Sequence, residues 1–330
     1  MKFPPTFTLT DAIQTCIHEL DVLKAAYGYL PVHQTLLTRI REESVLKSAL
    51  FSARIEGNPL TLPDAAVQLG SGRTDIHVRE VENINNTLSR LETDHDAPVS
   101  MELLKRFHSN VLQGISSEAG HIRTEESAIY NTSGVAVYLT PAPSTIMTLC
   151  NDVCTWVNHS QFHPSVTAGV AHIWFEKIHP FLDGNGRVGR LLSQYILLQK
   201  GFGFTGIVPF EEYLDTNRQA YYDALAVDRQ DVTAFVEFFC EALLFQTKRS
   251  MDALKHPIPS GYIPRMSPRR NELLAVIREH KLVSFDFLAR RFRAIPERTL
   301  HYDIHELMKK GYVQKLGITR GALYEAVSAV

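Results

Sequence analysis

The chain has 330 residues, of which 45% are hydrophobic and 21% charged, and its formal net charge at pH 7 is −2. This length allows two or three domains, and the composition shows no bias toward a disordered chain. The N-terminus lacks the apolar stretch of a signal peptide, and no apolar run approaches the roughly 20 residues of a membrane span. We therefore expect a cytoplasmic protein with no membrane contact. The four cysteines follow helical patterns without zinc-type spacing, which predicts reduced core thiols.

Helical patterns over residues 11–30 and 33–57 define an N-terminal helical region within residues 1–98. In the second pattern, apolar residues share one face over 44–55, and Gly57 and Pro59 provide a stop. Glu56 lies at the end of this helix, where a negative charge opposes the helix dipole. We expect Glu56 to be paired with a cation. The alternative is an ordinary exposed glutamate before a turn.

Residues 127–139 predict a β-hairpin in an otherwise helical chain. Two short strand-like segments, 127–130 and 135–139, flank an Asn-Thr-Ser-Gly turn at 131–134. An exposed hairpin edge can pair with an extended segment of another protein through main-chain hydrogen bonds. A purely stabilising hairpin is the alternative.

The densest group of reactive side chains lies at residues 179–190, His-Pro-Phe-Leu-Asp-Gly-Asn-Gly-Arg-Val-Gly-Arg. Gly184, Asn185 and Gly186 tolerate left-handed backbone geometry, so their N–H groups can form an anion-binding nest. Apolar residues then recur at helical spacing up to a stop at residues 200–201. The segment therefore feeds a helix N-terminus, where a phosphate is favoured.

Four side chains of this segment are suited to phosphate chemistry. Arg187 and Arg190 are neighbours on one helix face and can grip phosphate oxygens bidentately. Asp183 offers the hard oxygen that Mg²⁺ prefers, and His179 has an ordinary pKa near neutrality, which suits a proton acceptor. The segment matches neither a Walker A loop nor a dinucleotide-binding fingerprint. It predicts a phosphate-handling catalytic loop, although a His-Pro pair or a Gly-Asn-Gly turn alone is more typical of plain structure.

The 179–190 segment resembles the signature of the Fic family, His-Pro-Phe-x-Asp/Glu-Gly-Asn-Gly-Arg-x-x-Arg, with every fixed position filled. The resemblance implies a mainly α fold, in which a Fic-type helical bundle with one β-hairpin flap forms a catalytic core over residues 99–255. It also implies transfer of a nucleotide monophosphate, most often AMP from ATP, to a protein hydroxyl with release of pyrophosphate. The target would carry a Ser, Thr or Tyr hydroxyl, on another protein or on this chain itself.

The resemblance also assigns roles by position. His179 would deprotonate the target hydroxyl, and Asp183 would hold Mg²⁺. The two arginines would hold the β- and γ-phosphates of ATP. The complete set of residues assigned to the phosphates is Gly184, Asn185, Gly186, Arg187 and Arg190.

Residues 52–57 resemble the Ser/Thr-x-x-x-Glu-Gly/Asn inhibitory motif of Fic proteins that carry the inhibitory helix N-terminal to the core. In that motif, Ser52 and Glu56 would be inhibitory residues. Glu56 would pair with Arg190 and occupy the place that the γ-phosphate needs. The hairpin would be the flap that docks the target, through Val135, Val137 and Tyr138.

Residues 217–225 resemble the Fic helix that lines the adenine pocket. The resemblance points to Tyr221, Tyr222 and Leu225 as contacts of the base, although aromatic residues at such spacing more often belong to a core. Some family members place an asparagine slightly beyond the tyrosine pair, whereas this chain has Asp228 and Arg229. The choice of base therefore stays open.

Residues 256–264 are rich in Pro and Gly and predict a linker to a C-terminal domain over residues 265–330. That domain carries 13 Lys and Arg against 7 Asp and Glu, a net charge of +6, which leaves −8 for residues 1–264. Its predicted order is three helices (268–280, 284–292 and 296–310) and then two strands (312–316 and 322–327). Ser284 and Pro296 are typical helix-start residues. The order resembles a winged helix-turn-helix.

Two functions fit such a domain. If it binds DNA, its third helix would enter the major groove and a wing residue would contact phosphate. Winged helices also dock proteins or dimerise, and a charge of +6 does not make a dense basic stripe. DNA binding, protein docking and a homodimer all stay open. The candidate DNA contacts are Arg298, Thr299, His301 and Tyr302 on the helix and Arg320 at the wing tip.

We therefore predict a protein adenylyltransferase that is self-inhibited through Glu56, with ATP as substrate and Mg²⁺ as cofactor. Two other interpretations stay open. Fic-like loops also transfer UMP, phosphocholine or phosphate, or remove AMP from targets with a glutamate placed like Glu56. The chain could instead be a DNA-binding regulator whose Fic core senses nucleotide, which would tolerate loss of His179 but not Arg298→Ala.

Overall fold

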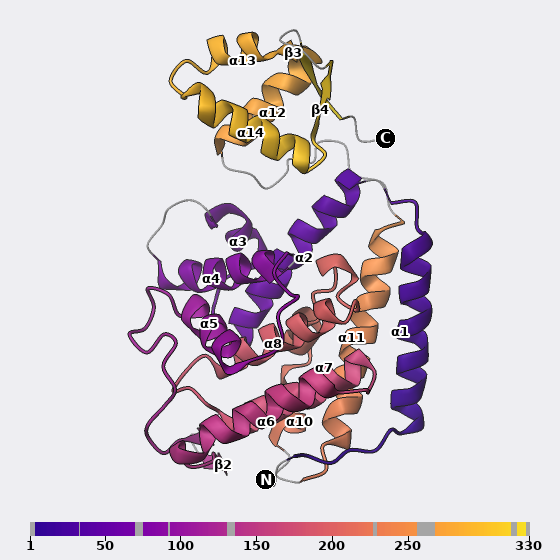
Figure 1. Ribbon diagram of the computed structural model, residues 1–330, viewed down its shortest axis with the longest axis vertical. Helices are drawn as coiled ribbons and strands as arrows, with labels where there is room; N and C mark the ends of the chain where they lie inside the picture. Colours follow the sequence, from indigo (N-terminus) through magenta and orange to yellow (C-terminus); the bar gives the residue numbers. More distant parts are fainter. Residues whose placement is uncertain are drawn as a thin grey trace. The chain divides into compact units, whose positions relative to one another are not determined.

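The structure is a computed structural model that describes residues 4–32, 34–69, 75–91, 93–130, 136–226, 230–255, 268–317 and 322–327 (Figure 1). The described chain is mainly helical with two small sheets, which confirms the predicted fold class. It divides into two compact units: unit 1 comprises residues 1–29 and 44–251, and unit 2 comprises residues 30–43 and 252–330. The predicted linker at 256–264 lies outside the described residues. Among the described residues, no helix is both long and apolar enough to cross a bilayer.

Unit 1 contains the elements before residue 251. They are α1 (Asp11–Tyr29), the part of α2 (Gln34–Ile55) from Ser44 onward, α3 (Leu62–Gln68), α4 (Ile76–Leu91), α5 (Met101–Val111), β1 (Ala128–Tyr130), β2 (Ala136–Leu139), η1 (Pro143–Thr145), α6 (Ile146–His159), α7 (Pro164–Ile178), α8 (Asn185–Gln199), η2 (Phe204–Gly206), α9 (Glu211–Thr216), α10 (Arg218–Ala226) and α11 (Thr233–Ala253).

Helices α7 and α8 form the centre of unit 1. Every residue from Ser165 to Ile178 of α7 is buried, including His172, Glu176 and Lys177, so no face of this helix is left for solvent. Helix α6 packs on α7, whereas α4 and α5 pack on α8 (Figure 1). The core of the unit therefore surrounds the connection between α7 and α8.

That connection is set by two left-handed residues. His179 caps α7 with φ 52° and ψ 59°, and its N–H donates to the Phe175 carbonyl at 3.0 Å. Gly184, with φ 82°, is the N-cap of α8. A positive φ is uncommon for a non-glycine residue and reverses the chain direction sharply. The sequence correctly predicts both the helix after the loop and its end, since α8 stops at Gln199 before Gly201 with φ 74°.

Helix α2 ends as the sequence predicts. Its last residue is Ile55, and Gly57 follows with φ 98°, a conformation that glycine adopts without strain. The helix begins at Gln34, within the helical pattern expected over 33–57. Glu56 therefore lies in the turn just after the helix.

The predicted hairpin is present as β1 and β2, which pair antiparallel with Ile129 opposite Tyr138. The register shifts between Ile129 and Tyr130, so the pairing is irregular next to the turn. Residues 131–135, including the candidate docking residue Val135, lie outside the described residues.

Unit 2 contains α12 (Pro268–His280), β3 (Leu282–Ser284), α13 (Phe285–Arg291), α14 (Glu297–Lys309), β4 (Val313–Leu316) and β5 (Leu323–Ala326), together with residues 34–43 of α2. The strands form an antiparallel sheet in the order β3-β5-β4. The predicted helices and the last two strands are confirmed, with Ser284 capping α13 by accepting from the Phe287 N–H. Strand β3 was not predicted. The unit has its own apolar core, which includes Leu274, Leu288 and Leu300.

Candidate active site

The backbone of the α7–α8 connection is fixed by one buried side chain. The Asn185 carboxamide accepts from the Phe181 N–H (3.0 Å) and donates to the Phe181 carbonyl (2.8 Å). Asn185 is 2% exposed, so its side chain faces the loop and not solvent. Hydrogen bonds within the chain therefore fix the shape of the loop, which is the preorganisation that an anion-binding nest requires.

His108 of α5 contacts the same loop through a hydrogen bond and a ring stack. Its Nδ1 accepts from the Gly120 N–H (2.9 Å), so Nε2 carries the hydrogen and donates to the Asp183 carbonyl (2.9 Å). The ring stacks on Phe181, with centroids 3.8 Å apart. Burial lowers the pKa of His108, which keeps this neutral tautomer at neutral pH.

His179 ends α7, in the connection that leads to α8. Burial lowers the pKa of its imidazole, while the backbone carbonyl of Glu176 acts in the opposite direction. A lowered pKa keeps the ring neutral near pH 7, the form that accepts a proton. Its carbonyl accepts from Arg123 Nε at 2.7 Å.

Arg190 is enclosed by the end of α2. Its Nε donates to Ser52 Oγ (2.9 Å), and its Nη2 donates to the Ser52 carbonyl (2.9 Å) and to Glu56 Oε1 (2.8 Å). Burial opposes the charge of Arg190, which is 1% exposed, but Glu56 and other acidic neighbours raise its pKa overall. The ion pair between Glu56 and Arg190, expected from the resemblance, is present. A Cβ on Gly186 would lie 2.3 Å from Glu56 Oε1, so the carboxylate uses the space that this glycine leaves.

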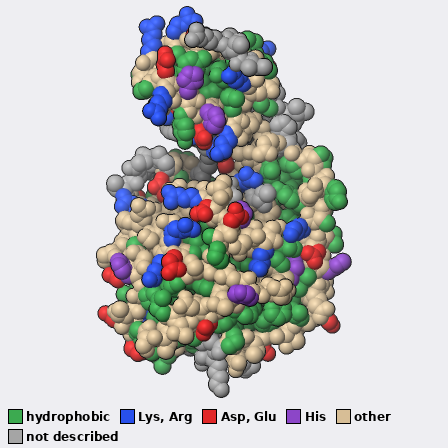
Figure 2. Space-filling model, in the orientation of Figure 1, with side chains coloured by type: hydrophobic (Ala, Val, Ile, Leu, Met, Phe, Trp, Pro, Cys, Tyr) green, Lys and Arg blue, Asp and Glu red, His purple; other side chains and the backbone are tan. Residues whose placement is uncertain are grey.

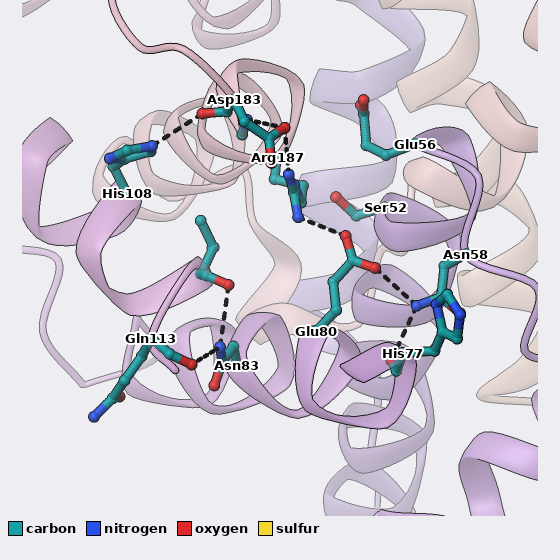
Figure 3. A network of polar contacts seen from close by, with 12 residues as sticks. Ser52, Glu56, Asn58, His77, Glu80, Asn83, His108, Gln113, Asp183 and Arg187 are labelled. Carbon is teal, nitrogen blue, oxygen red and sulfur yellow. Dashed lines mark hydrogen bonds and ion pairs between the residues drawn. The ribbon is translucent and has the colours of Figure 1, made fainter. Parts of the chain in front are cut away.

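Arg187 is held by two carboxylates (Figure 3). Its Nη1 donates to Glu80 Oε1 of α4 at 2.5 Å, and its Nη2 donates to Asp183 Oδ1 at 2.8 Å. The second oxygen of Glu80 accepts from Asn58 Nδ2 at 2.8 Å. No sequence motif points to Glu80 or Asn58.

Asp183 fits a divalent cation. Its side chain is 68% exposed, and Oδ1 accepts from Arg187 and from the Gly184 N–H (2.6 Å). Mg²⁺ is usually held by one or two carboxylates together with phosphates and waters, so a single exposed carboxylate beside a phosphate nest suffices. Among the described residues, no group of three or more His, Cys, Asp or Glu side chains could hold a metal by itself.

The three residues expected at the adenine pocket lie in different surroundings. Tyr221 is 1% exposed and its hydroxyl bonds His172 Nε2 at 2.7 Å, so this ring belongs to the core. Tyr222 is 38% exposed and donates to the Ile55 carbonyl at the end of α2 (2.8 Å). Leu225 is half-buried. Residues 228 and 229 lie outside the described residues.

Of the three residues predicted to dock a target, Tyr138 has a side chain that the structure describes. It is 6% exposed, and Lys177 Nζ lies 4.4 Å from its ring centroid in a cation–π contact. Val137 is part of β2, and its neighbour Leu139 is 77% exposed. The edge of β2 thus carries an apolar side chain that is free to meet another surface.

The candidate DNA contacts in α14 are partly occupied within unit 2. His301 stacks on Phe285 with centroids 3.7 Å apart, and the Tyr302 ring, 57% exposed, lies under the Arg270 guanidinium. Arg298 is exposed and Thr299 is half-buried, whereas Arg320 lies outside the described residues. Figure 2 shows Lys and Arg side chains on the visible face of unit 2, which is the basic part of the chain.

Comparisons with known proteins agree with this geometry. Residues 98–197 match the family model described as "Fic/DOC family". The chain is 28% identical over 269 residues to protein adenylyltransferase Fic of Aedes aegypti, covering 74% of this chain and 50% of that protein. It is 29% identical over 267 residues to protein adenylyltransferase fic-1 of Caenorhabditis elegans, covering 76% and 50%. The chain thus spans about half the length of these curated relatives.

Solved structures are similar as well. A Fic family protein from Desulfovibrio desulfuricans G20 superposes with a TM-score of 0.70 at 24% identity, covering 98% of both chains. A fragment of Fic-1 from C. elegans superposes with a TM-score of 0.61 at 26% identity, covering 73% of this chain and 72% of that one. The likeness extends from the signature residues to the fold that positions them. Residues 98–197 of this chain therefore resemble the Fic/DOC family in sequence, within a fold that solved Fic proteins share.

Proposed function

We propose that the chain is a protein adenylyltransferase that moves AMP from ATP to a Ser, Thr or Tyr hydroxyl of a target protein or of the chain itself. The observation that carries this proposal is the complete signature loop, with a neutral His179 held at the N-terminus of α8 beside two arginines. The names of the curated relatives support the same reaction.

In the proposed reaction, the target hydroxyl oxygen attacks the α-phosphorus of ATP while its proton passes to His179. The bond from the α-phosphorus to the oxygen that bridges to the β-phosphate breaks, and pyrophosphate leaves. The N–H groups at the start of α8, from Asn185 onward, would face the phosphates. Arg187 and Arg190 neutralise the charge on the β- and γ-phosphates, and Mg²⁺ held by Asp183 would add to this neutralisation.

The same proposal includes autoinhibition. The Glu56 carboxylate occupies Arg190 and the space over Gly186, where a γ-phosphate would have to bind. Tyr222 adds a bond to the Ile55 carbonyl, so a residue assigned to the adenine pocket also holds the end of α2. ATP must displace both contacts before it can bind productively.

Further parts of the proposal concern partners. We infer that the hairpin docks the target by strand pairing along β2, for which the exposed Leu139 is a first contact. We also infer that residues 265–330 form a winged helix, since the order α12-β3-α13-α14-β4-β5 is the order of that fold. DNA and a second copy of the chain are its candidate partners.

Transfer is tested with purified protein, Mg²⁺ and ATP labelled at the α-phosphate, by following label on protein. The Glu56→Gly protein should be labelled at least about tenfold faster than the parent, because a charge-assisted bond worth roughly 1.5–3 kcal/mol no longer opposes ATP. His179→Ala added to Glu56→Gly should cost about 100-fold or more.

Glu118→Gly is the matched control, since it removes an exposed glutamate from another turn. Its labelling should equal that of the parent. Absence of label in every variant, with ATP still bound, would reject AMP transfer and favour another donor or a nucleotide-sensing role.

A further inference from the structure

We propose that Glu80 is a second inhibitory carboxylate, which holds Arg187 away from the nucleotide as Glu56 holds Arg190. This inference rests on the proposed use of both arginines for phosphate. Glu80 belongs to α4, whereas Ser52 lies in α2 and Glu56 in the turn that follows α2. The two restraints therefore come from separate elements.

The contacts of Arg187 leave little capacity for a phosphate. Glu80 takes Nη1 at 2.5 Å and Asp183 takes Nη2 at 2.8 Å, while the arginine side chain is 5% exposed. Its Nε is buried without a hydrogen-bond partner among the described residues. The two carboxylates use one N–H on each Nη, and because the side chain is only 5% exposed, the N–H groups that remain are not open to a bidentate phosphate while both carboxylates stay in place.

The local charge points the same way. The two arginines contribute two positive charges, and Glu56, Glu80 and Asp183 contribute three negative charges within direct ion pairs. A site with this balance repels a triphosphate, because the nearby carboxylates outweigh the cations. Binding of a cation at Asp183 and release of Glu80 would change the net charge of the site from negative to positive.

Asn58 links the two restraints (Figure 3). Its Nδ2 donates to Glu80 Oε2 (2.8 Å) and to the His77 carbonyl (2.9 Å), and its Oδ1 accepts from the Leu60 N–H (3.1 Å). Asn58 is 6% exposed and lies two residues after Glu56. Movement of the Glu56 turn would pull Asn58 from Glu80 and so loosen its hold on Arg187. Release of one carboxylate thereby favours release of the other.

Nucleotide binding without turnover tests this inference. All proteins carry His179→Ala, and binding of Mg²⁺–ATP is measured by calorimetry. Glu80→Gln removes the charge and keeps the size, and Glu80→Asp keeps the charge but shortens its reach. Each should tighten ATP binding about three- to tenfold, as expected when a competing, partly buried ion pair worth roughly 0.7–1.4 kcal/mol is lost. Glu102→Gln, at an exposed position of α5, is the matched control and should not change the affinity.

The contact of Asn58 with Glu80 leads to a second prediction. In a double-mutant cycle, the gain from Glu80→Gln should be smaller when Glu56→Gly is already present, because that turn no longer holds Asn58. Unchanged or weaker ATP binding in both Glu80 variants would overturn the inference and make Glu80 a residue that positions Arg187. Failure of AMP transfer in Glu56→Gly, with tighter binding in the Glu80 variants, would instead reject the proposed reaction and leave this inference standing.

Discussion

At the scale of single residues, the proposed AMP transfer depends on the protonation state of His179, its proposed proton acceptor. Burial lowers the pKa of this imidazole below its ordinary value of 6.5; Arg123 acts in the same direction, and Glu56 and Asp183 oppose it. Because the neutral ring is the proton acceptor, transfer by Glu56→Gly should stay constant as pH falls through 6.5 and decline only in more acid solution. A pH–rate profile checks this, with His179→Ala as the blank. A midpoint above 6.5 would contradict it.

Arg123 governs the position of the same histidine. Its Nε donates to the His179 carbonyl (2.7 Å) and its Nη2 to the Pro141 carbonyl (2.6 Å), so it joins the end of α7 to the chain that leaves the hairpin. Lysine keeps the charge but cannot make both bonds. Arg123→Lys should lower kcat about tenfold, because small misplacements of a reacting group are costly, and leave ATP affinity unchanged. Arg106→Lys, on the surface of α5, is the control. A roughly tenfold loss of ATP affinity in Arg123→Lys, equal to its loss of kcat, would argue against a positioning role.

Residue chemistry was predictable where the partners are neighbours in sequence. The 179–190 segment contains the candidate base, carboxylate and arginines together, so its local pattern is enough to predict a site there. His108 contacts Asp183 across 75 positions, and Glu80 contacts Arg187 across 107. Nothing in the periodicity of α4 or α5 distinguishes these two side chains from ordinary helix residues.

At the scale of elements, the packing of α7 against α11 depends on a glycine. A Cβ at Gly169 would lie 3.1–3.3 Å from three atoms of Phe239, which is buried and flanked by Phe210 and Phe235 and so cannot yield. Gly169→Ala should destabilise unit 1 by roughly 1–3 kcal/mol through overpacking. Gly28→Ala in α1, where a Cβ meets open space, should stabilise by roughly 0.5–1 kcal/mol through helix propensity. Chemical denaturation measures both, and equal shifts would refute the packing argument.

The limits of prediction at this scale are also physical. Helices α8 and α14 have long periodic patterns with clear end signals, and their existence was predictable. Strand β3 has three residues, too few for a period of two to show, and its partner β5 lies near the end of the chain. Tyr221 and Tyr222 are adjacent on α10, and only the packing decides that the first ring is buried and the second exposed.

At the scale of the whole molecule, the net charge differs in sign between two parts of the chain, and each of the two units has its own hydrophobic core. Residues 265–330 carry +6 and the rest −8, yet part of the basic charge is already used inside unit 2. The buried Asp303 accepts from Arg269 Nε (2.5 Å) and Arg270 Nε (2.7 Å). A nucleic-acid surface there would therefore depend on exposed residues such as Arg298, whose contacts with phosphate would weaken with added salt.

Because each unit has its own hydrophobic core, we expect two thermal transitions. Mg²⁺–ATP should raise the free energy of unfolding of unit 1 only, by about 2.7 kcal/mol when the ligand concentration is 100 times the Kd. Asp303→Asn should lower the free energy of unfolding of unit 2 only, by roughly 1–3 kcal/mol, because it removes the negative charge that two arginines share. Glu297→Gln, an exposed charge at the start of the same helix, is the control. A single transition that moves with both ATP and Asp303→Asn would mean instead that the two units unfold together, and that occupancy of one is felt in the stability of the other.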